Sequence, residues 1–245
     1  MTDPERGADM VSVNEWRARK MNTEERSYDA VIFDLDGTLL DTEKYYFAKW
    51  KEAMAHFGYH MTDEEAYSVR SLGMPYAPEH FKKLYGEDFD YDKVHTYRRK
   101  LTDQVLDEGP IEAKPGAEEL LKYLRKKGVR TAIATAGGVE RSSSLLKRVG
   151  LYDYLDHIVS ARQVAHGKPA PDVYLKAAGQ LGADPSACLV FEDVPMGILA
   201  GKNAGMRVCA VDDWFSRPQD AKKRELADYF IHSYEDITNQ TYEVL

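Results

Sequence analysis

The chain has 245 residues, 43% of them apolar, and a formal net charge of −8. This length fits one large domain, or a medium domain with a smaller insertion, and the apolar share can form a substantial core. The acidic balance, with no long basic block, argues against nucleic acid as a partner. No apolar run approaches the roughly 18 residues that span a bilayer, so we expect no membrane partner.

Residues 1–27 are polar, carry mixed charges and lack the apolar segment of a signal peptide. We expect them to form a flexible or loosely docked extension of a monomeric, cytoplasmic protein. Cys188 and Cys209 each lie in an apolar run, and the sequence contains no CxxC pattern. We interpret both as small buried hydrophobic residues, because a disulfide or a metal site has poor support.

The first predicted element is a buried strand, whose apolar residues Ala30–Phe33 lead directly into the sequence DLDGT at 34–38. The following residues, 42–112, have a helical pattern rich in Tyr, Lys and Glu, and no confident strand. We expect four helices there, at 43–58, 63–73, 78–86 and 92–109. The sequence therefore predicts a helical insertion directly after the first strand.

From residue 113 onward, short apolar strands alternate with amphipathic helices. The predicted strands are 128–135, 157–161, 187–193, 207–213 and 228–233. The predicted helices are 117–128, 139–149, 171–181, 196–204 and 217–226. This alternation predicts an α/β fold with a doubly wound, Rossmann-like parallel sheet. We divide the chain into an extension, 1–27, an α/β core, 28–41 and 113–245, and a helical insertion, 42–112.

Carboxylates follow two of these strands. Asp34 and Asp36 come after the first strand, and Glu192 and Asp193 end the strand 187–193. The first pair could be simple turn chemistry, because Asp-Gly is a common turn dipeptide. If the two strands are neighbours, however, all four acids share one edge of the sheet, where like charges about 4 Å apart repel by roughly 4 kcal/mol. Such an oxygen-rich cluster predicts Mg²⁺.

Two further side chains fit the same edge of the sheet. Lys168, in the loop after the third core strand, could supply a fixed positive charge, and Thr135 could supply a hydroxyl. This set suits phosphoryl transfer, in which catalysis is mostly positioning and charge neutralisation. An aspartate can accept the phosphoryl group covalently while a second carboxylate moves the proton. Gly37 would let the backbone turn closely beside the phosphate.

Four motifs occur in order, each after a strand: DLDGT at 34–38, Thr135 in IATAGG, GKPAPD at 167–172 and FEDVPMGILAGKNAGM at 191–206. On these residues the chain resembles the haloacid dehalogenase (HAD) superfamily, in the branch with a helical C1 cap after the first strand. The resemblance covers residues 29 to about 235. It implies a Mg²⁺-dependent phosphatase, with residues 42–112 as the inserted α-helical cap domain.

The resemblance also implies roles for single residues. Asp34 would be the nucleophile and Asp36 the general acid/base, and the acid at position 36 favours phosphate chemistry over dehalogenation. Thr135 and Lys168 would bind the transferring phosphoryl group, and Lys168 would also hold Asp34. Mg²⁺ would be held by Asp34, the backbone carbonyl of Asp36, Asp193 and, directly or through water, Glu192.

Two positions depart from the family pattern. Relatives often carry a small polar residue after the threonine, whereas here Ala136 and Gly137 follow Thr135. This loop provides only backbone amides as hydrogen-bond donors, so we expect phosphate contacts from the amides of Ala136 and Gly137. In the fourth motif Val194 stands where a serine is common, which removes one hydroxyl.

Substrate choice is expected to lie with the cap. The segment 41–50 resembles β-phosphoglucomutase and sugar-phosphate phosphatases, and Trp50 matches that group. Tyr46 stands where β-phosphoglucomutase carries a histidine that helps gate its cycle, so a sugar or polyol phosphate phosphatase is favoured over a hexose phosphate mutase. Arg70 could bind a second anionic or hydroxyl-rich group, or be an exposed structural arginine. A third hypothesis, a non-catalytic binding protein, is disfavoured by the intact acids and lysine.

Overall fold

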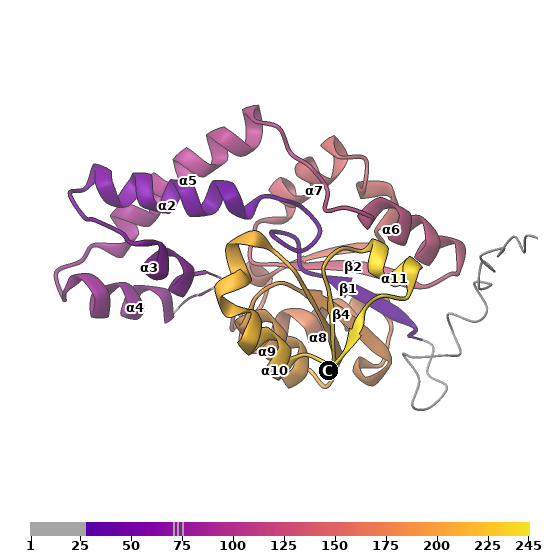
Figure 1. The fold of residues 1–245 in the computed structure, drawn as a ribbon. Helices are drawn as coiled ribbons and strands as arrows, with labels where there is room; N and C mark the ends of the chain where they lie inside the picture. Colours follow the sequence, from indigo (N-terminus) through magenta and orange to yellow (C-terminus); the bar gives the residue numbers. More distant parts are fainter. Residues whose placement is uncertain (1–27, 71, 73, 75) are drawn as a thin grey trace, which may run out of the picture.

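The computed structural model describes residues 28–245 apart from 71, 73 and 75 (Figure 1). The predicted extension, residues 1–27, lies outside the described residues. The core is a seven-stranded sheet in the order β3-β2-β1-β4-β5-β6-β7. All neighbouring strands are parallel except β7, which pairs antiparallel with β6 at the edge. The predicted α/β fold with a doubly wound, Rossmann-like sheet is confirmed.

The central strand is β1 (Ala30–Phe33), which is buried along its whole length between β2 and β4. The other strands are β2 (Arg130–Thr135), β3 (His157–Ser160), β4 (Cys188–Glu192), β5 (Arg207–Val211), β6 (Tyr229–Ile231) and β7 (Glu243–Val244). Their near-continuous apolar sequences follow from burial of the sheet on both faces. Because β2, β1 and β4 are parallel neighbours, their carboxyl ends bring three of the four motifs to one edge of the sheet.

Helices cover both faces of the sheet (Figure 1). One face packs against α6 (Ala117–Lys126), α7 (Val139–Arg148) and α11 (Glu235–Asn239), and the other against α8 (Asp172–Leu181), α9 (Pro195–Asn203) and α10 (Asp220–Leu226). Short 3-10 helices occupy Tyr152–Tyr154, Ala161–Gln163, Pro185–Ala187 and Trp214–Gln219. The predicted helix 217–226 begins too early, because Pro218 lies in the last 3-10 helix and has no N–H for an α-helical bond.

The insertion after β1 consists of α2 (Glu43–His56), α3 (Asp63–Ser68), α4 (Tyr76–Tyr85) and α5 (Tyr91–Glu108). The helices α2 and α5 lie side by side and, with α4, enclose an apolar core that includes Trp50, Met54 and Phe81 (Figure 1). Its two connections to the sheet domain are joined by a hydrogen bond of 3.0 Å from the Asp41 amide to the Glu112 carbonyl. No helix in the described part of the chain combines the length and apolarity needed to cross a membrane.

Candidate active site

A buried lysine and three carboxylates meet where β1 and β4 end. Asp34, Glu192 and Asp193 are all buried, and each offers an oxygen within 4.8 Å of the others. The Nζ atom of Lys168 donates to Asp34 Oδ1 at 2.5 Å and to Glu192 Oε1 at 2.6 Å. It also donates to the carbonyl of Ala134 at 3.2 Å, which fixes it to β2. Four residues from three motifs, far apart in sequence, therefore form one cluster.

Burial and charge act against each other in this cluster. Burial raises the pKa of the Asp34 carboxyl, and the neighbouring Lys168 ammonium counteracts that rise. Burial alone would lower the pKa of Lys168, but the carboxylates of Asp34 and Glu192 outweigh it and raise that pKa above its usual range. The lysine therefore stays charged and holds one oxygen of Asp34, Oδ1.

Both oxygens of Glu192 are already bonded to protein groups. Oε1 accepts from Lys168 and from the Tyr174 hydroxyl at 2.8 Å, and Oε2 accepts from the amides of Asp193 and Val194 at 3.0 and 3.4 Å. A Cβ on Gly197, in the first turn of α9, would lie 1.8 Å from Oε1, so glycine is required for this close approach. Four protein donors therefore occupy the two oxygens of Glu192.

Asp193 is held from two sides. Its Oδ1 accepts from the hydroxyl of Thr38 at 2.9 Å, and its Oδ2 accepts from Arg70 at 2.7 Å. Gly37 has φ +81°, and a Cβ there would lie 2.4 Å from Asp193 Oδ2. The close approach expected at Gly37 is thus to this carboxylate. Thr38 is fully buried; it lies within the first motif, but its contact with Asp193 is not visible in the sequence.

Asp36 lies beside these groups at the start of the insertion. Burial raises the pKa of Asp36, and a hydrogen bond of 2.6 Å from the Thr42 hydroxyl to its Oδ1 lowers it. Interaction with the Tyr46 hydroxyl lowers it further, but the net direction is upward. A carboxyl with a raised pKa is suited to giving a proton to a leaving group and taking one from water.

The loop after β2 is fixed by its own hydroxyl groups. Thr135 is buried, and its Oγ1 accepts from the Gly137 amide at 2.9 Å. The Ser160 hydroxyl donates to the Gly137 carbonyl at 2.5 Å, and that of Ser142 to the Gly138 carbonyl at 3.0 Å. The Gly137 amide is therefore engaged inside the loop, whereas the hydroxyl proton of Thr135 remains available for a phosphoryl oxygen.

Arg70 connects the insertion to the sheet domain. Its guanidinium contacts three carboxylates, Glu43 at 3.1 Å, Asp193 at 2.7 Å and Asp213 at 3.3 Å, and its side chain is only 4% exposed. Asp213 also accepts from Lys114 at 2.7 Å. Arg70 is thus neither exposed nor free. Its partners Glu43 and Asp213 could not be predicted from sequence motifs, because they contact Arg70 only in the folded chain.

The other predicted specificity residues lie on α2. Trp50 packs inside the insertion against Phe81, with ring centroids 4.8 Å apart, and is 7% exposed. Tyr46 faces the guanidinium of Arg98 on one side and Asp36 on the other. Of this pair, Tyr46 is the residue near the carboxylate cluster, and Trp50 belongs to the apolar core.

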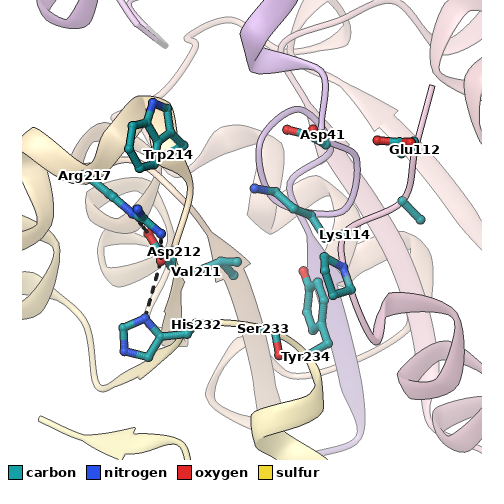
Figure 2. A pocket seen from close by; sticks show the side chains of 12 residues that line it. Asp41, Glu112, Lys114, Val211, Asp212, Trp214, Arg217, His232, Ser233 and Tyr234 are labelled. Carbon is teal, nitrogen blue, oxygen red and sulfur yellow. Dashed lines mark hydrogen bonds and ion pairs between the residues drawn. The ribbon is translucent and has the colours of Figure 1, made fainter. Parts of the chain in front are cut away.

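A separate cavity of about 570 Å³ opens beside the connections to the insertion (Figure 2). Lys114 and Trp214 line it, but none of the clustered carboxylates does. Its charged groups are paired within the protein, since Asp212 accepts from Arg217 at 2.9 Å and lies 3.4 Å from His232. The candidate active site is therefore the carboxylate–lysine cluster and not this cavity.

Comparison with known proteins identifies the family of this chain. The family described as haloacid dehalogenase-like hydrolase matches residues 31–211, and the chain belongs to it. Hexitol phosphatase A of Escherichia coli is 33% identical over 208 residues, which cover 84% of this chain and 92% of that protein. The fructose-1-phosphate phosphatase YqaB of Escherichia coli is 32% identical over 183 residues, covering 73% and 94%.

Solved structures show the same fold. The CbbY protein of Rhodobacter sphaeroides in complex with phosphate superimposes with a TM-score of 0.72 at 23% identity, over 86% of this chain and 96% of that chain. The predicted family and enzyme class, a phosphatase of the HAD superfamily, are confirmed.

Proposed function

We propose that this protein is a Mg²⁺-dependent phosphatase that releases phosphate from a small sugar or polyol phosphate through an aspartyl-phosphate intermediate. The observation that carries the proposal is the buried Lys168, which binds one oxygen of Asp34 and leaves the other free to attack. Relatives named as phosphatases of fructose 1-phosphate, of hexitols and of phosphorylated carbohydrates support this substrate class.

In the first step the free oxygen of Asp34 forms a bond to phosphorus while the bond from phosphorus to the leaving oxygen breaks. Asp36 gives its proton to that oxygen. In the second step a water oxygen attacks the same phosphorus, Asp36 takes the water's proton, and the bond to Asp34 breaks. Lys168 and Thr135 are assigned to the phosphoryl oxygens, together with the backbone amide of Ala136. The Gly137 amide, also predicted for this role, is left out because it donates to Thr135 Oγ1.

The donor set fits a magnesium ion, because it offers several buried carboxylate oxygens and few nitrogens or sulfurs. We assign the metal to Asp34, the backbone carbonyl of Asp36 and Asp193, with Glu192 acting through water and through Lys168. When bound, Mg²⁺ neutralises charge on the phosphoryl oxygens. We also propose that residues 28–41 with 113–245 form the core, that 42–112 form the cap, and that the protein acts as a cytoplasmic monomer.

A screen of sugar, polyol, nucleotide and glycolate phosphates with Mg²⁺, with and without EDTA, tests the proposal. We expect turnover that EDTA abolishes and that Asp34→Asn abolishes without unfolding the protein. Asp88→Asn, the same change on an exposed cap residue, is the control and should keep full activity. Full activity of Asp34→Asn would disprove the mechanism.

The alternatives separate by product and by binding. The hexose phosphate mutase alternative is not favoured, since the relatives named above are phosphatases. Phosphorus NMR on β-glucose 1-phosphate would show glucose 6-phosphate from a mutase and inorganic phosphate from a phosphatase. Tight binding of phosphate esters with no turnover across the whole screen would instead indicate a binding protein.

A further inference from the structure

One partly buried arginine of the insertion has no counterion among the described residues. Arg98, on α5, lies over the ring of Trp50, with the guanidinium carbon 4.5 Å from the ring centroid, and 5.5 Å from the ring centroid of Tyr46. Its Nε is buried without a hydrogen-bond acceptor, and no residue in the described part of the chain forms an ion pair with it. A buried charge without a partner is unfavourable, so this position requires a reason.

The nearest acidic groups belong to other arginines. Glu43 and Asp103 both act electrostatically on Arg98, but Glu43 is bound to Arg70 at 3.1 Å and Asp103 to Arg141 at 3.0 Å. The pKa values show the contrast: burial lowers the pKa of Arg98, whereas the three carboxylates around Arg70 outweigh burial and raise its pKa. Arg98 therefore carries a positive charge with which no carboxylate among the described residues is paired.

Other arginines act on the same turn of α5 as Arg98. The pKa of His95, one turn earlier on α5, is lowered to about 4, first by burial and then by Arg98, Arg99 and Arg162. Arg162 belongs to the sheet domain, where its guanidinium lies next to Gly138 in the loop after β2. Arg162 therefore acts on the same turn of α5 as Arg98 and lies, with the carboxylate of Glu140, next to the loop assigned to the phosphoryl group.

Arg98 is also close to the reacting groups. Tyr46 contacts the guanidinium on one side and lowers the pKa of Asp36 on the other, so a single tyrosine separates Arg98 from the proposed acid/base. The two aromatic rings fix the plane of the guanidinium, which reduces the entropy lost when it binds a planar or tetrahedral anion. Arg70, the residue predicted for a second anion, instead forms ion pairs with three carboxylates.

We propose that Arg98 binds a second anionic group of the substrate, so that the preferred substrates are phosphorylated carbohydrates with a second phosphate or a carboxylate at the end remote from the reacting phosphate. This inference rests on the proposed phosphatase function and narrows its substrate class. Guanidinium groups bind both kinds of anion through paired N–H donors. A phosphate ester of a neutral polyol would leave the Arg98 charge without a paired anion.

Matched pairs of compounds test the proposal. The pairs are glycerol 3-phosphate with 3-phosphoglycerate, glucose 6-phosphate with 6-phosphogluconate, and fructose 1-phosphate with fructose 1,6-bisphosphate. Each compound is measured as a substrate and as a competitive inhibitor of p-nitrophenyl phosphate hydrolysis. We expect the member of at least one pair that carries the second anionic group to be favoured by about tenfold or more in kcat/KM or in inhibition constant. This factor corresponds to the free energy that one hydrogen bond to a charged group contributes to binding. The first two pairs report a carboxylate and the third a second phosphate.

Variants assign the preference to Arg98. Arg98→Gln should reduce it by about 10- to 100-fold, and Arg98→Lys should recover part of it because the charge is kept. Arg99→Gln, the same change at the exposed neighbouring residue, should retain the wild-type preference. Thermal unfolding shows whether each variant is folded. If Arg98→Gln is unfolded, the partial loss of the charge preference expected for Arg98→Lys tests the role of Arg98.

The outcomes separate the two proposals. Absence of p-nitrophenyl phosphate hydrolysis by the wild-type protein with Mg²⁺ would contradict the phosphatase function itself. Hydrolysis of that ester with no charge preference in any pair, or with a preference that persists in Arg98→Gln, would overturn the role of Arg98 and leave the phosphatase function standing.

Discussion

Replacing the buried lysine of the active site tests the electrostatic part of the argument. Lys168→Met keeps a long apolar stem but removes the charge that binds Asp34 and Glu192 at 2.5 and 2.6 Å. Removing one partner from a buried ion pair costs about 3–5 kcal/mol, because the remaining charge is left uncompensated. In a domain of this size each kcal/mol lowers Tm by about 2–4 °C, so we expect a decrease of roughly 6–20 °C.

The loss should depend on pH in a definite direction. Burial already raises the pKa of Asp34 in the folded protein, and Lys168 opposes that rise, so the substitution raises this pKa further. A carboxyl whose pKa is raised by folding destabilises the protein above its unfolded value of about 3.9, increasingly as pH rises toward the folded value. The free energy of unfolding lost through Lys168→Met should therefore be larger at about pH 8 than at about pH 5.

The assay is urea unfolding of both proteins at the two pH values, without metal. Lys222→Met is the control, because it removes the same charge from a surface pair with Glu225 whose partners are 53% and 65% exposed. That control should change stability by no more than about 1 kcal/mol at either pH. A loss for Lys168→Met no larger than the control, or one that grows as pH falls, would refute the electrostatic argument.

Three other substitutions have expected results. Gly197→Ala should lower the free energy of unfolding by about 1–3 kcal/mol, since the new Cβ would lie 1.8 Å from Glu192 Oε1. Gly179→Ala is the control and should not destabilise the protein, because a Cβ there meets nothing within 4 Å. Equal losses of stability in the two variants would contradict the role of this close contact. Arg70→Gln should tighten Mg²⁺ binding by about tenfold in calorimetry, because it frees Asp193 Oδ2, and unchanged affinity would count against this competition. Folding lowers the pKa of His95 from 6.5 to about 4. Protonation of His95 therefore does not reduce the free energy of unfolding above pH 6.5, but reduces it increasingly as pH decreases toward 4. In His95→Gln this decrease in the free energy of unfolding should be smaller by about 1–2 kcal/mol, after allowance for solvent screening, as measured by urea unfolding. An unchanged dependence of the free energy of unfolding on pH would exclude the effect.

The sheet and its edge were predictable because each rests on local patterns. Continuous apolar runs such as Ala30–Phe33 indicate strands buried on both faces, and parallel strands bring their carboxyl ends together. That reasoning alone placed Asp34 near Glu192. The short elements α11 and β7 were not predicted, since five and two residues give too little periodicity to detect.

The contacts between the insertion and the sheet domain could not be predicted from motifs. Arg70 meets Asp193 and Asp213 across more than 120 positions of sequence, and only the folded arrangement decides which arginine is paired. The same holds for Arg98, whose significance lies in having no acidic partner among the described residues. A paired arginine and a partly buried, unpaired one look alike in sequence.

The most direct test of the central claim is chemical trapping of the phosphoryl group on Asp34. In Asp36→Asn, p-nitrophenyl phosphate can still transfer its phosphoryl group because its leaving group needs little protonation, whereas attack by water lacks its base. The intermediate should therefore accumulate. Acid quenching within the first turnover, followed by mass spectrometry of the peptides, should find one phosphoryl group on Asp34. Release of p-nitrophenol with Asp34 unmodified, or with the phosphoryl group on another residue, would contradict the mechanism.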